Sequence, residues 1–476
     1  MRTAPAIATD PLMRHYARSR AWCEWEAFEQ WRPRMLGALA CAEGPAVSPF
    51  QLLSLPGVSA AQQHDCAGQW MQARLLASTQ ARADVALAFA ALDATAAPRE
   101  ARRPIRLGYL SGDFHMHATA LLLAETLEAH DSERFELHAY SHGADDGSAM
   151  RRRLQATFAG FHDISGCDDA QAARAIHADG IDILIDLKGY TVGTRSMVLA
   201  YRPAPVQVSY LGYPGTLGAG LCDYLVSDRF VTPASERNDY SEALACLPHS
   251  YQPHGHAAAL PPAPSRAEAG LPEAGLVLCS FNQAYKFTPE VFGVWCDVLA
   301  QVPGSVLWLL KDERAEGNLR LEAMARGIAP HRLVFAPDLP QAEHLARLQC
   351  ADLVLDTAPY NAHTTASDAL WAGVPLVTCA GETFASRVAG SLLHAVGLPE
   401  LVTHSLADYA ALALALASDA SRLAALRGKL GRLRAAAALF DVAGYTRDLE
   451  ALYDAMWQRH TAGLAPQGLD LPQRPC

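Results

Sequence analysis

The 476-residue chain lacks the short motifs that identify several common classes of protein. Its 11 cysteines include no C-x-x-C pair, which argues against a disulfide framework and a zinc knuckle and favours a reducing environment. No G-x-G-x-x-G, Walker A or G-x-S-x-G motif occurs, so dehydrogenase, P-loop and hydrolase functions lose their usual support. No run approaches the roughly 20 apolar residues that a membrane helix needs, and the first residues hold no signal-like apolar segment. We therefore expect a cytoplasmic protein without a membrane partner.

Positive charge is also in short supply. The 50 acidic residues outnumber the 39 basic ones, and the net charge of −11 argues against nonspecific nucleic-acid binding. Half of the residues are apolar and 19% are charged, as in folded globular proteins rather than disordered ones. A length of 476 residues exceeds what one hydrophobic core usually serves, so we expect two or three domains and no nucleic-acid partner.

Lysine is scarce, since only four of the 39 basic residues are lysines. Three of them, Lys188, Lys286 and Lys311, follow closely on strand-like apolar runs. Ligands of open parallel sheets bind beyond the carboxyl ends of the strands. A lysine at such an end can meet a phosphate group as a compact positive charge. A codon bias towards arginine would also make lysine rare.

The apolar pattern predicts an α/β protein with two successive parallel-sheet domains. We expect a helical N-terminal segment over residues 1–100. Short buried strands that alternate with helices then predict a Rossmann-like domain over residues 101–262 and another over residues 263–435. Residues 436–476 should form a C-terminal helix and a loose tail. Two such domains would face a cleft, where small ligands usually bind.

Individual apolar segments support this division into domains. In the N-terminal segment, Trp22, Trp25, Phe28 and Trp31 have the spacing of one apolar helix face, which we assign to the core. Residues 406–459 are expected to form a long amphipathic helical stretch. The expected strands cover residues 105–110, 135–140, 182–187, 206–211 and 224–227 in the first sheet, and 276–281, 305–310, 332–335, 352–356 and 374–378 in the second.

The most informative segment is residues 351–378. A short apolar strand runs into Asp356, and a loop of small residues then leads to His363-Thr-Thr at the expected start of a helix. A helix start attracts anions through its dipole and its free amides, so this pattern can hold a phosphate without a metal. Thr365-x-x-Asp368 is also a variant of the capping box, which begins many helices that bind nothing.

Polar residues follow three expected strands of the second domain. They lie in F-N-Q-A-Y-K (281–286), in the loop before Glu343-His-Leu-Ala-Arg347, and in Asn361-Ala-His-Thr-Thr365. Carboxyl ends of parallel strands share one edge of a sheet, so these residues predict a nucleotide site. No Asp-x-Asp pair follows a strand to hold Mg²⁺. A diphosphate would therefore be neutralised by Lys, Arg, His and helix dipoles, and we expect neither a metal site nor a cofactor.

The first domain offers a candidate for acid–base chemistry. Its first expected strand ends just before Asp113, His115 and His117. His-x-His can be half of a metal site, but no further cluster of ligands accompanies it. Histidine is the commonest general base near neutral pH. A loop histidine held by an ordinary hydrogen bond fits the same pattern, and the sequence leaves this alternative open.

Seven motifs follow one another along the chain. They are G-Y-L-S-G-D-F-x-x-H (108–117), A-Y-R-P-A-P-V-Q (200–207), L-G-Y-P-G-T-x-G (211–218), F-N-Q-x-Y-K (281–286), P-G-S-V-L-W-L-L (303–310), N-x-H-T-T-x-x-D (361–368) and G-E-T-x-A-S-R-V (381–388). Together they closely resemble the catalytic region of the O-GlcNAc transferase / SPINDLY family of protein glycosyltransferases, over about residues 100–455.

This resemblance implies a fold and a reaction. The fold would be the metal-independent GT-B type, with two Rossmann-like domains. The reaction would be an inverting transfer of a sugar from a nucleotide sugar, typically UDP-GlcNAc, to Ser or Thr hydroxyls of proteins. The implied partners are therefore a nucleotide sugar and a protein or peptide acceptor.

The resemblance also implies roles for individual residues. By position, Lys286 and Gln283 would contact the diphosphate, and Lys286 would stabilise the charge that develops on it in the transition state. The other donor contacts would come from His363, Thr364 and Thr365 around the diphosphate, Asp368 at the ribose, and His344 with Arg347 at the base.

The first domain would supply the acceptor side. His117 and Asp113 match positions near the acceptor hydroxyl that are candidate proton acceptors. Gly212, Tyr213 and Pro214 would help to line the sugar site.

Several residues depart from the family's pattern. The departures are Ala118 in place of Pro, Gln341 and Val192 in place of two lysines of animal members, and Tyr360 in place of Cys. They leave the sugar open, because the SPINDLY branch uses GDP-fucose and another relative transfers glucose to asparagine. These 476 residues do not include the family's tandem helical repeats, and the sequence leaves open whether this is a natural short form or a trimmed chain. A sugar-nucleotide-binding scaffold without catalysis is an alternative of another class, although Lys286, His363 and His117 are intact.

Overall fold

The computed structural model describes residues 11–39, 47–85, 87–88, 103–255 and 260–472, and its strands form two parallel sheets. Contacts divide the chain into two units. Unit 1 comprises Met1–Ser59 and Ala258–Ala437, and unit 2 comprises Ala60–Ala257 and Ala438–Cys476. The helices expected as one N-terminal segment are therefore shared between the two units.

Unit 2 contains an eight-stranded sheet in the order β14-β7-β6-β5-β4-β1-β2-β3. Its strands are β1 (Ile105–Ser111), β2 (Phe135–Ser141), β3 (Gly160–Asp163), β4 (Ile183–Asp186), β5 (Val206–Ser209), β6 (Tyr224–Asp228), β7 (Ala243–Leu247) and β14 (Leu469–Asp470). The five strands expected from the sequence are present as β1, β2, β4, β5 and β6. Leu110 of β1 pairs with Asp186 of β4, so the loops after these two strands begin side by side.

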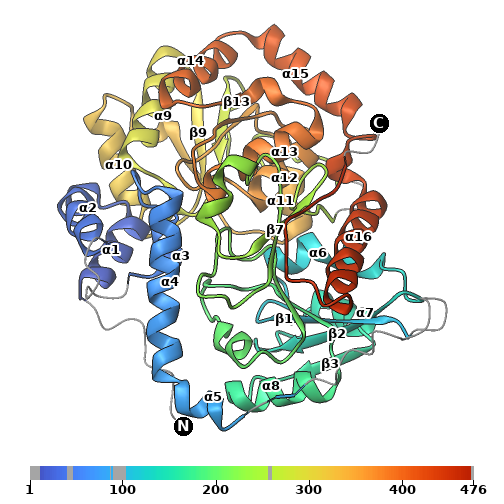
Figure 1. The fold of residues 1–476 in the computed structure, drawn as a ribbon. Helices are drawn as coiled ribbons and strands as arrows, with labels where there is room; N and C mark the ends of the chain where they lie inside the picture. Colours follow the sequence, from blue (N-terminus) through green and yellow to red (C-terminus); the bar gives the residue numbers. More distant parts are fainter. Residues whose placement is uncertain (1–10, 40–46, 86, 89–102, 256–259, 473–476) are drawn as a thin grey trace. The chain divides into compact units, whose positions relative to one another are not determined.

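The helices of unit 2 are α4 (Ala60–Ala77), α5 (Thr79–Ala83), α6 (Ala118–Glu128), α7 (Ala149–Thr157), α8 (Asp169–Ala178) and α16 (Val442–Thr461). The C-terminal helix α16 contacts α6 and the strands β5 and β7 (Figure 1). Glu450 of α16 accepts hydrogen bonds from the Asp131 amide at 2.8 Å and from Arg134 at 3.0 Å. These contacts explain why residues from the end of the chain complete unit 2.

Unit 1 contains a six-stranded sheet in the order β10-β9-β8-β11-β12-β13. Its strands are β8 (Val277–Ser280), β9 (Val306–Leu310), β10 (Leu333–Ala336), β11 (Leu353–Leu355), β12 (Leu376–Cys379) and β13 (Val402–Thr403). All five strands expected for the second domain are present. They are buried apolar runs such as V-L-W-L-L in β9, as a sheet with both faces covered requires.

The helices of unit 1 are α1 (Pro11–Trp22), α2 (Trp25–Leu39), α3 (Pro49–Leu52), α9 (Pro289–Gln301), α10 (Glu316–Ala325), α11 (Gln341–Leu348), α12 (Thr364–Trp371), α13 (Val388–Val396), α14 (Leu406–Ala417) and α15 (Ala420–Leu433). Thr288 caps α9 by accepting a hydrogen bond from the Val291 amide at 3.2 Å, and Pro289 occupies the first helical position. Helix α9 thus starts directly after the loop that carries Lys286.

The expected aromatic face does not lie on one helix. Helix α1 ends at Trp22 and α2 begins at Trp25, because Cys23 adopts a left-handed conformation with φ of 52°. The assignment to the core is correct for Trp25 and Phe28, which are 4% and 0% exposed. Trp22 and Trp31 are only partly buried.

The expectations for the C-terminal part need two corrections. The helical stretch over residues 406–459 is three helices, of which α14 and α15 belong to unit 1 and α16 belongs to unit 2. The expected loose tail contains β14, which pairs with β7. Arg229 holds this short strand by donating hydrogen bonds to Asp470 Oδ2 at 3.0 Å and to the Leu471 carbonyl at 2.6 Å.

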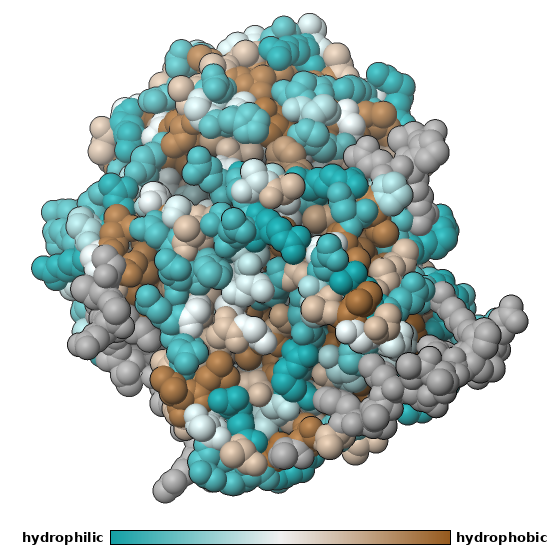
Figure 2. All heavy atoms as spheres, in the orientation of Figure 1, coloured by the Kyte–Doolittle hydropathy of each residue, from teal (hydrophilic) through white to brown (hydrophobic). Residues whose placement is uncertain are grey.

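The surface mixes polar and apolar residues, as Figure 2 shows for one face. The large apolar side chains that are exposed are Leu76, Met116, Val192, Leu321, Met324, Leu339 and Leu464. Within the described residues, no single helix has the length and apolar character of a membrane span. Only the pair α14 and α15, bent by 98°, meets that criterion when the two are taken together.

Candidate active site

The strand order of unit 1 reverses between β8 and β11. The chain proceeds from β8 to β9 and β10 on one side and from β11 to β12 and β13 on the other. Val354 of β11 pairs with Cys279 of β8, so the loops after these strands leave the sheet next to each other. Ligands of open parallel sheets bind at such a reversal. Both loops carry residues that the sequence assigns to a diphosphate.

Lys286 lies at this reversal and reaches the loop after β11. It ends the short helix η4 (Ala284–Lys286). Its Nζ donates a hydrogen bond to the Asn361 carbonyl at 2.8 Å and lies 3.9 Å from the centre of the Tyr360 ring. The residue is 8% exposed, and burial lowers the pKa of Lys286 to about 7, against the attraction of Asp356. An ammonium has three donors, so Lys286 can hold this carbonyl and an anion together.

Asp356 is buried below the loop after β11. Its Oδ1 accepts hydrogen bonds from the amides of Thr357 at 2.7 Å and Ala362 at 2.6 Å, and its Oδ2 accepts one from Thr378 Oγ1 at 2.6 Å. Burial raises the pKa of Asp356 to about 7, and these hydrogen bonds and Lys286 oppose the shift. Asp356 therefore fixes the loop that Lys286 contacts.

Helix α12 begins at Thr364, as expected, with His363 in the N-cap position. Thr365 Oγ1 donates a hydrogen bond to Asn282 Oδ1 at 3.0 Å, which joins α12 to the loop after β8. The capping-box alternative with Asp368 is wrong, because Thr365 lies inside the first turn and its side chain faces the neighbouring loop. First-turn amides have no acceptor within the helix, so those of Thr364 and Thr365 can bind an anion.

The His363 ring adds a neutral group to this cluster. Its Nε2 lies 3.2 Å from the Ala385 carbonyl, which can only accept, so Nε2 carries the proton. Burial, together with the charge of Lys286, lowers the pKa of His363 well below its usual range. The ring is therefore uncharged at neutral pH. Its centroid lies 5.0 Å from that of Tyr360.

His344 and Arg347 lie one turn apart on α11 and contact each other. Arg347 Nη2 donates a hydrogen bond to His344 Nδ1 at 3.0 Å, so Nδ1 is the unprotonated nitrogen. The guanidinium carbon of Arg347 lies 4.9 Å from the centroid of the Phe281 ring, and the His344 ring lies 5.3 Å from it. Burial lowers the pKa of His344. The structure thus brings together the two residues assigned to the nucleobase.

The other donor-side residues occupy nearby elements. Gln341 Nε2 lies 3.4 Å from both carboxylate oxygens of Asp368, the residue assigned to the ribose. Gln283 is exposed and lines a pocket of about 400 Å³ together with Lys311. Lys311 forms an ion pair with Glu313 at 3.6 Å.

In unit 2, Asp113 and Lys188 form a buried ion pair. Lys188 Nζ donates a hydrogen bond to Asp113 Oδ1 at 2.5 Å, and the two residues are 8% and 6% exposed. The expectation that Lys188 meets a phosphate does not fit this contact, because its ammonium binds a carboxylate of the protein. Lys188 instead supports a residue of the candidate site.

The turn after β4 places Lys188. The carboxylate of Asp186 accepts hydrogen bonds from the amides of Lys188 at 3.1 Å and Gly189 at 2.9 Å. Burial raises the pKa of Asp186 to about 6. This turn and the Lys188–Asp113 pair connect the end of β4 to the loop after β1.

His117 caps helix α6 with its ring. Its Nδ1 accepts a hydrogen bond from the Thr119 amide at 3.2 Å, and an amide can only donate, so the neutral ring carries its proton on Nε2. Nδ1 also lies 3.7 Å from Asp113 Oδ2. Burial lowers the pKa of His117, while Asp113 opposes the shift. The histidine is thus held by an ordinary hydrogen bond, as the alternative interpretation held, and its other nitrogen remains for a ligand.

The turn after β5 contains the three residues assigned to the sugar. A Cβ on Gly212 would lie 1.9 Å from the Leu187 carbonyl oxygen, so the close approach of the two turns requires glycine. Tyr213 and Pro214 are buried, and the Tyr213 ring packs on Tyr190 at 5.3 Å between centroids. Its assignment to a sugar site stays a prediction.

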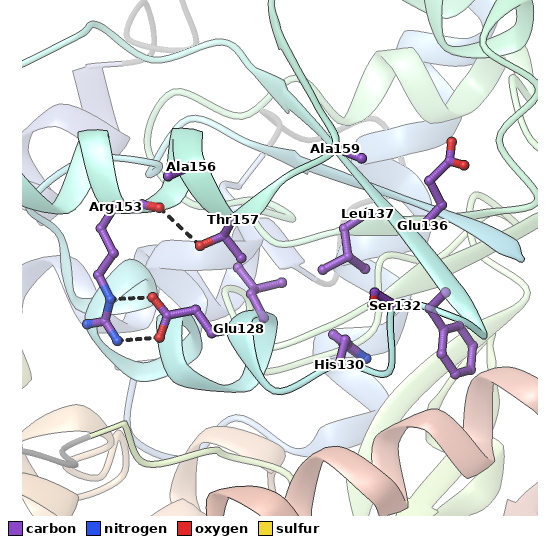
Figure 3. A pocket seen from close by; sticks show the side chains of 11 residues that line it. Glu128, His130, Ser132, Glu136, Leu137, Arg153, Ala156, Thr157 and Ala159 are labelled. Atoms are coloured by element: carbon purple, nitrogen blue, oxygen red, sulfur yellow. Dashed lines mark hydrogen bonds and ion pairs between the residues drawn. The ribbon is translucent and has the colours of Figure 1, made fainter.

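One pocket of unit 2 contains none of the assigned residues. It measures about 550 Å³ and is lined by residues of α6, β2 and α7 (Figure 3). Its Glu128 accepts two hydrogen bonds of 2.6 Å from Arg153, so these charges neutralise each other. In the described part of the chain, no three His, Cys, Asp or Glu side chains gather as a metal site. Independence of metals stays a prediction.

Sequence reasoning noted Asp356 at a strand end without giving it a role, and it gave no role to Asp186 or Asn282, although all three support the site. Asp186 and Asp356 occupy equivalent places at strand ends and hold the following backbone through their carboxylates. Asn282 links two loops through its side chain. An aspartate that closes a buried apolar run is a signal that could have indicated the first two. The partner of Asn282 lies 83 residues away and gives no local signal.

Comparisons with known proteins agree with this architecture. Residues 85–263 and 261–449 match glycosyl transferase family 41. A mutant of the O-GlcNAc transferase of Thermobaculum terrenum has a similar structure, with a TM-score of 0.70 and 27% identity over 97% of this chain and 100% of that chain. The Anabaena protein HepE, solved with UDP and glucose, has a TM-score of 0.52 at 13% identity over 74% of this chain and 100% of that one, which shows the fold alone. The expected GT-B type of α/β fold is confirmed.

Curated relatives share the sequence over most of this chain. The probable UDP-N-acetylglucosamine–peptide N-acetylglucosaminyltransferase SEC of Arabidopsis thaliana is 40% identical over 76% of the chain and 38% of its own length. The corresponding enzyme of Caenorhabditis elegans is 32% identical over 76% of the chain and 41% of its own length. The chain thus spans about two fifths of the length of these relatives. The resemblance seen in the motifs is confirmed, and the chain belongs to glycosyl transferase family 41.

Proposed function

We propose that the chain transfers N-acetylglucosamine from UDP-GlcNAc to Ser or Thr hydroxyls of proteins, with inversion and without a metal ion. The names of the relatives support the donor and the class of acceptor, since both are UDP-N-acetylglucosamine–peptide transferases. The expectations of a cytoplasmic location and of no nucleic-acid or membrane partner stay predictions.

One observation carries the proposal. Buried Lys286 and the first turn of α12 face the same point of unit 1, where the strand order reverses. An ammonium and free helix amides together can neutralise a diphosphate. His344 and Arg347 then offer an adjoining place for the nucleobase, next to Phe281.

We propose a direct displacement. The acceptor oxygen attacks the anomeric carbon while the bond from that carbon to the diphosphate oxygen breaks, and the electron pair of that bond leaves with UDP. The departing UDP gains negative charge, so Lys286 and α12 bind it more strongly in the transition state than in the ground state. Attack from the face opposite to the leaving group inverts the anomeric centre.

The acceptor hydroxyl must lose a proton in this step. In neutral His117, Nε2 already carries a proton, so the ring is suited to donate a hydrogen bond rather than to accept a proton. Asp113 has one oxygen bound by Lys188, and its other oxygen faces His117. We therefore assign proton acceptance to Asp113 and binding of a substrate oxygen to His117.

An assay with three donors tests the proposal. The protein is incubated with UDP-GlcNAc, GDP-fucose or UDP-glucose and a library of Ser- and Thr-containing peptides, and the released nucleotide and the mass of the peptides are measured. We expect UDP release and a gain of one N-acetylhexosamine only with UDP-GlcNAc. Transfer from GDP-fucose or UDP-glucose instead would contradict the donor assignment.

A thermal melt distinguishes an active transferase from a sugar-nucleotide-binding scaffold without catalysis. A ligand that binds the folded state raises its melting temperature. Stabilisation by UDP without any transfer would favour a sugar-nucleotide-binding scaffold. No stabilisation and no transfer with any nucleotide would contradict both functions.

A further inference from the structure

Arg20 of helix α1 binds the backbone on both sides of Lys286. Its Nη1 donates a hydrogen bond to the Phe287 carbonyl at 2.9 Å, and its Nη2 donates one to the Tyr285 carbonyl. Arg20 is 2% exposed, although it lies more than 260 residues away in the sequence. The planar guanidinium can hold two carbonyls at fixed separation, which a lysine ammonium cannot match.

The segment that Arg20 holds has little internal support. Helix η4 is three residues long, and its backbone hydrogen bonds run from Lys286 to Gln283 and from Phe287 to Ala284, both at 3.0 Å. The carbonyls of Tyr285 and Phe287 take their side-chain partner from α1. Without Arg20 these carbonyls would lose their donors, and the loop would be free to adopt other conformations.

Neighbouring residues fix α1 and α2 on unit 1. Cys23 Sγ lies 3.6 Å from the Ala284 carbonyl, and Asn318 Nδ2 donates a hydrogen bond to the Trp22 carbonyl at 2.8 Å. The Trp25 ring lies 5.1 Å from that of Phe292 on α9. The N-terminal helices therefore form a rigid support for Arg20.

Burial of this arginine is costly. Desolvation lowers the pKa of Arg20, and its hydrogen-bond acceptors are carbonyls rather than carboxylates. The Phe28 ring offsets part of the cost, with its centroid 4.9 Å from the guanidinium carbon. An apolar side chain would fill the same core at a lower desolvation cost, so the benefit of Arg20 lies in the two carbonyls that it orders.

We propose that Arg20 is a positioning residue that fixes the 284–287 backbone and thereby aims Lys286 at the diphosphate site. The inference rests on the proposed function for its catalytic part. Its structural part, the ordering of the loop, holds for the protein without any ligand.

Two variants and a control test the inference. Arg20→Met removes both hydrogen bonds, and Arg20→Lys keeps the charge but not the fork. Arg18→Met is the matched control, because Arg18 lies on the same helix, pairs with Glu24 at 3.7 Å and stacks on Trp22. Hydrogen–deuterium exchange of the ligand-free proteins reports on residues 281–287, and turnover of UDP-GlcNAc reports on Lys286.

We expect at least 10-fold faster exchange of the 284–287 amides in both Arg20 variants, with exchange in β9 unchanged. Turnover should fall about 10- to 100-fold, because a small displacement of a catalytic group has an effect of this size, and the donor KM should change much less. The Arg18→Met protein should behave as the wild type.

Unchanged exchange in the loop of a folded Arg20→Lys protein would overturn the ordering role. Faster exchange with unchanged turnover would overturn the catalytic part. If the wild-type protein turns over no donor, the proposed function fails, while the exchange measurement still decides whether Arg20 orders the loop.

Discussion

The ammonium of Lys188 lies 2.5 Å from Asp113 Oδ1, and both residues are buried in unit 2. The pair joins the loops after β1 and β4, which are neighbours in the sheet. It leaves the second oxygen of Asp113 directed at His117, at 3.7 Å from Nδ1. Lys188 thus orients the carboxylate that we assign to proton acceptance.

Removal of one partner of this pair should be costly. Lys188→Met leaves the Asp113 carboxylate buried without its counter-ion, so we expect a loss of about 3 kcal/mol in the free energy of unfolding. The double variant Lys188→Met/Asp113→Asn should recover much of that loss, because no charge remains buried. Urea denaturation measures both values. The single variant Asp113→Asn is measured in the same way, and a loss in the double variant equal to the sum of the two single losses would show that the pair is not coupled.

An exposed ion pair provides the matched control. Lys429 lies 2.5 Å from Glu400 in unit 1, and their side chains are 39% and 43% exposed. Lys429→Met should reduce the stability by less than about 1 kcal/mol, since solvent screens such pairs.

The cap of α6 predicts the protonation of His117. At pH 8 the ring should be neutral with its proton on Nε2, which the ¹⁵N chemical shifts of the two ring nitrogens report. Burial lowers the pKa of His117 in the folded protein below the usual value of 6.5. The unfolded chain therefore takes up the second ring proton, which makes the imidazole cationic, more readily than the folded chain does. The contribution of His117 to stability is therefore complete above pH 6.5 and is lost as the pH falls below it. A proton on Nδ1 at pH 8 would contradict the capping contact.

Binding of UDP should be linked to protonation of Lys286. Burial lowers the pKa of Lys286 to about 7, so at pH 8.5 most of the free protein carries a neutral amine there. A bound diphosphate favours the ammonium, and UDP binding should then take up close to one proton. Calorimetry in buffers of different ionisation enthalpy measures this uptake. The Lys286→Met protein should show none, and an equal uptake in that variant would place the proton elsewhere.

The sequence predicted the parts of the fold that depend on local pattern. Ten expected strands are present, because each is a short apolar run bounded by turn residues. Four strands, β3, β7, β13 and β14, were not expected. Strand β3, with the sequence G-F-H-D, lacks such a run, whereas β7, with the sequence A-L-A-C-L, is an apolar run that was left unassigned. Strands β13 and β14 have two residues each, and β14 is held by β7 and Arg229. The break between Trp22 and Trp25 depends on one left-handed residue, which periodicity does not reveal.

The sequence predicted the site residues that belong to recognisable local patterns. It did not predict the residues that support them from distant parts of the chain. Lys286 and His363 lie in the motifs, and His344 lies among the polar residues that follow an expected strand; all three belong to unit 1. Arg20 has the sequence appearance of a solvated helix residue. Its role depends on carbonyls that approach it only in the folded chain.

Steady-state kinetics of Lys286→Met test the central claim most directly, with Lys311→Met as the control for a lysine at another strand end. If Lys286 stabilises the departing UDP, kcat should fall by about 100-fold or more while the KM for UDP-GlcNAc changes little, because the interaction strengthens in the transition state. Lys311→Met should retain most of the turnover. A Lys286→Met enzyme with nearly normal kcat and only a raised donor KM would contradict the account.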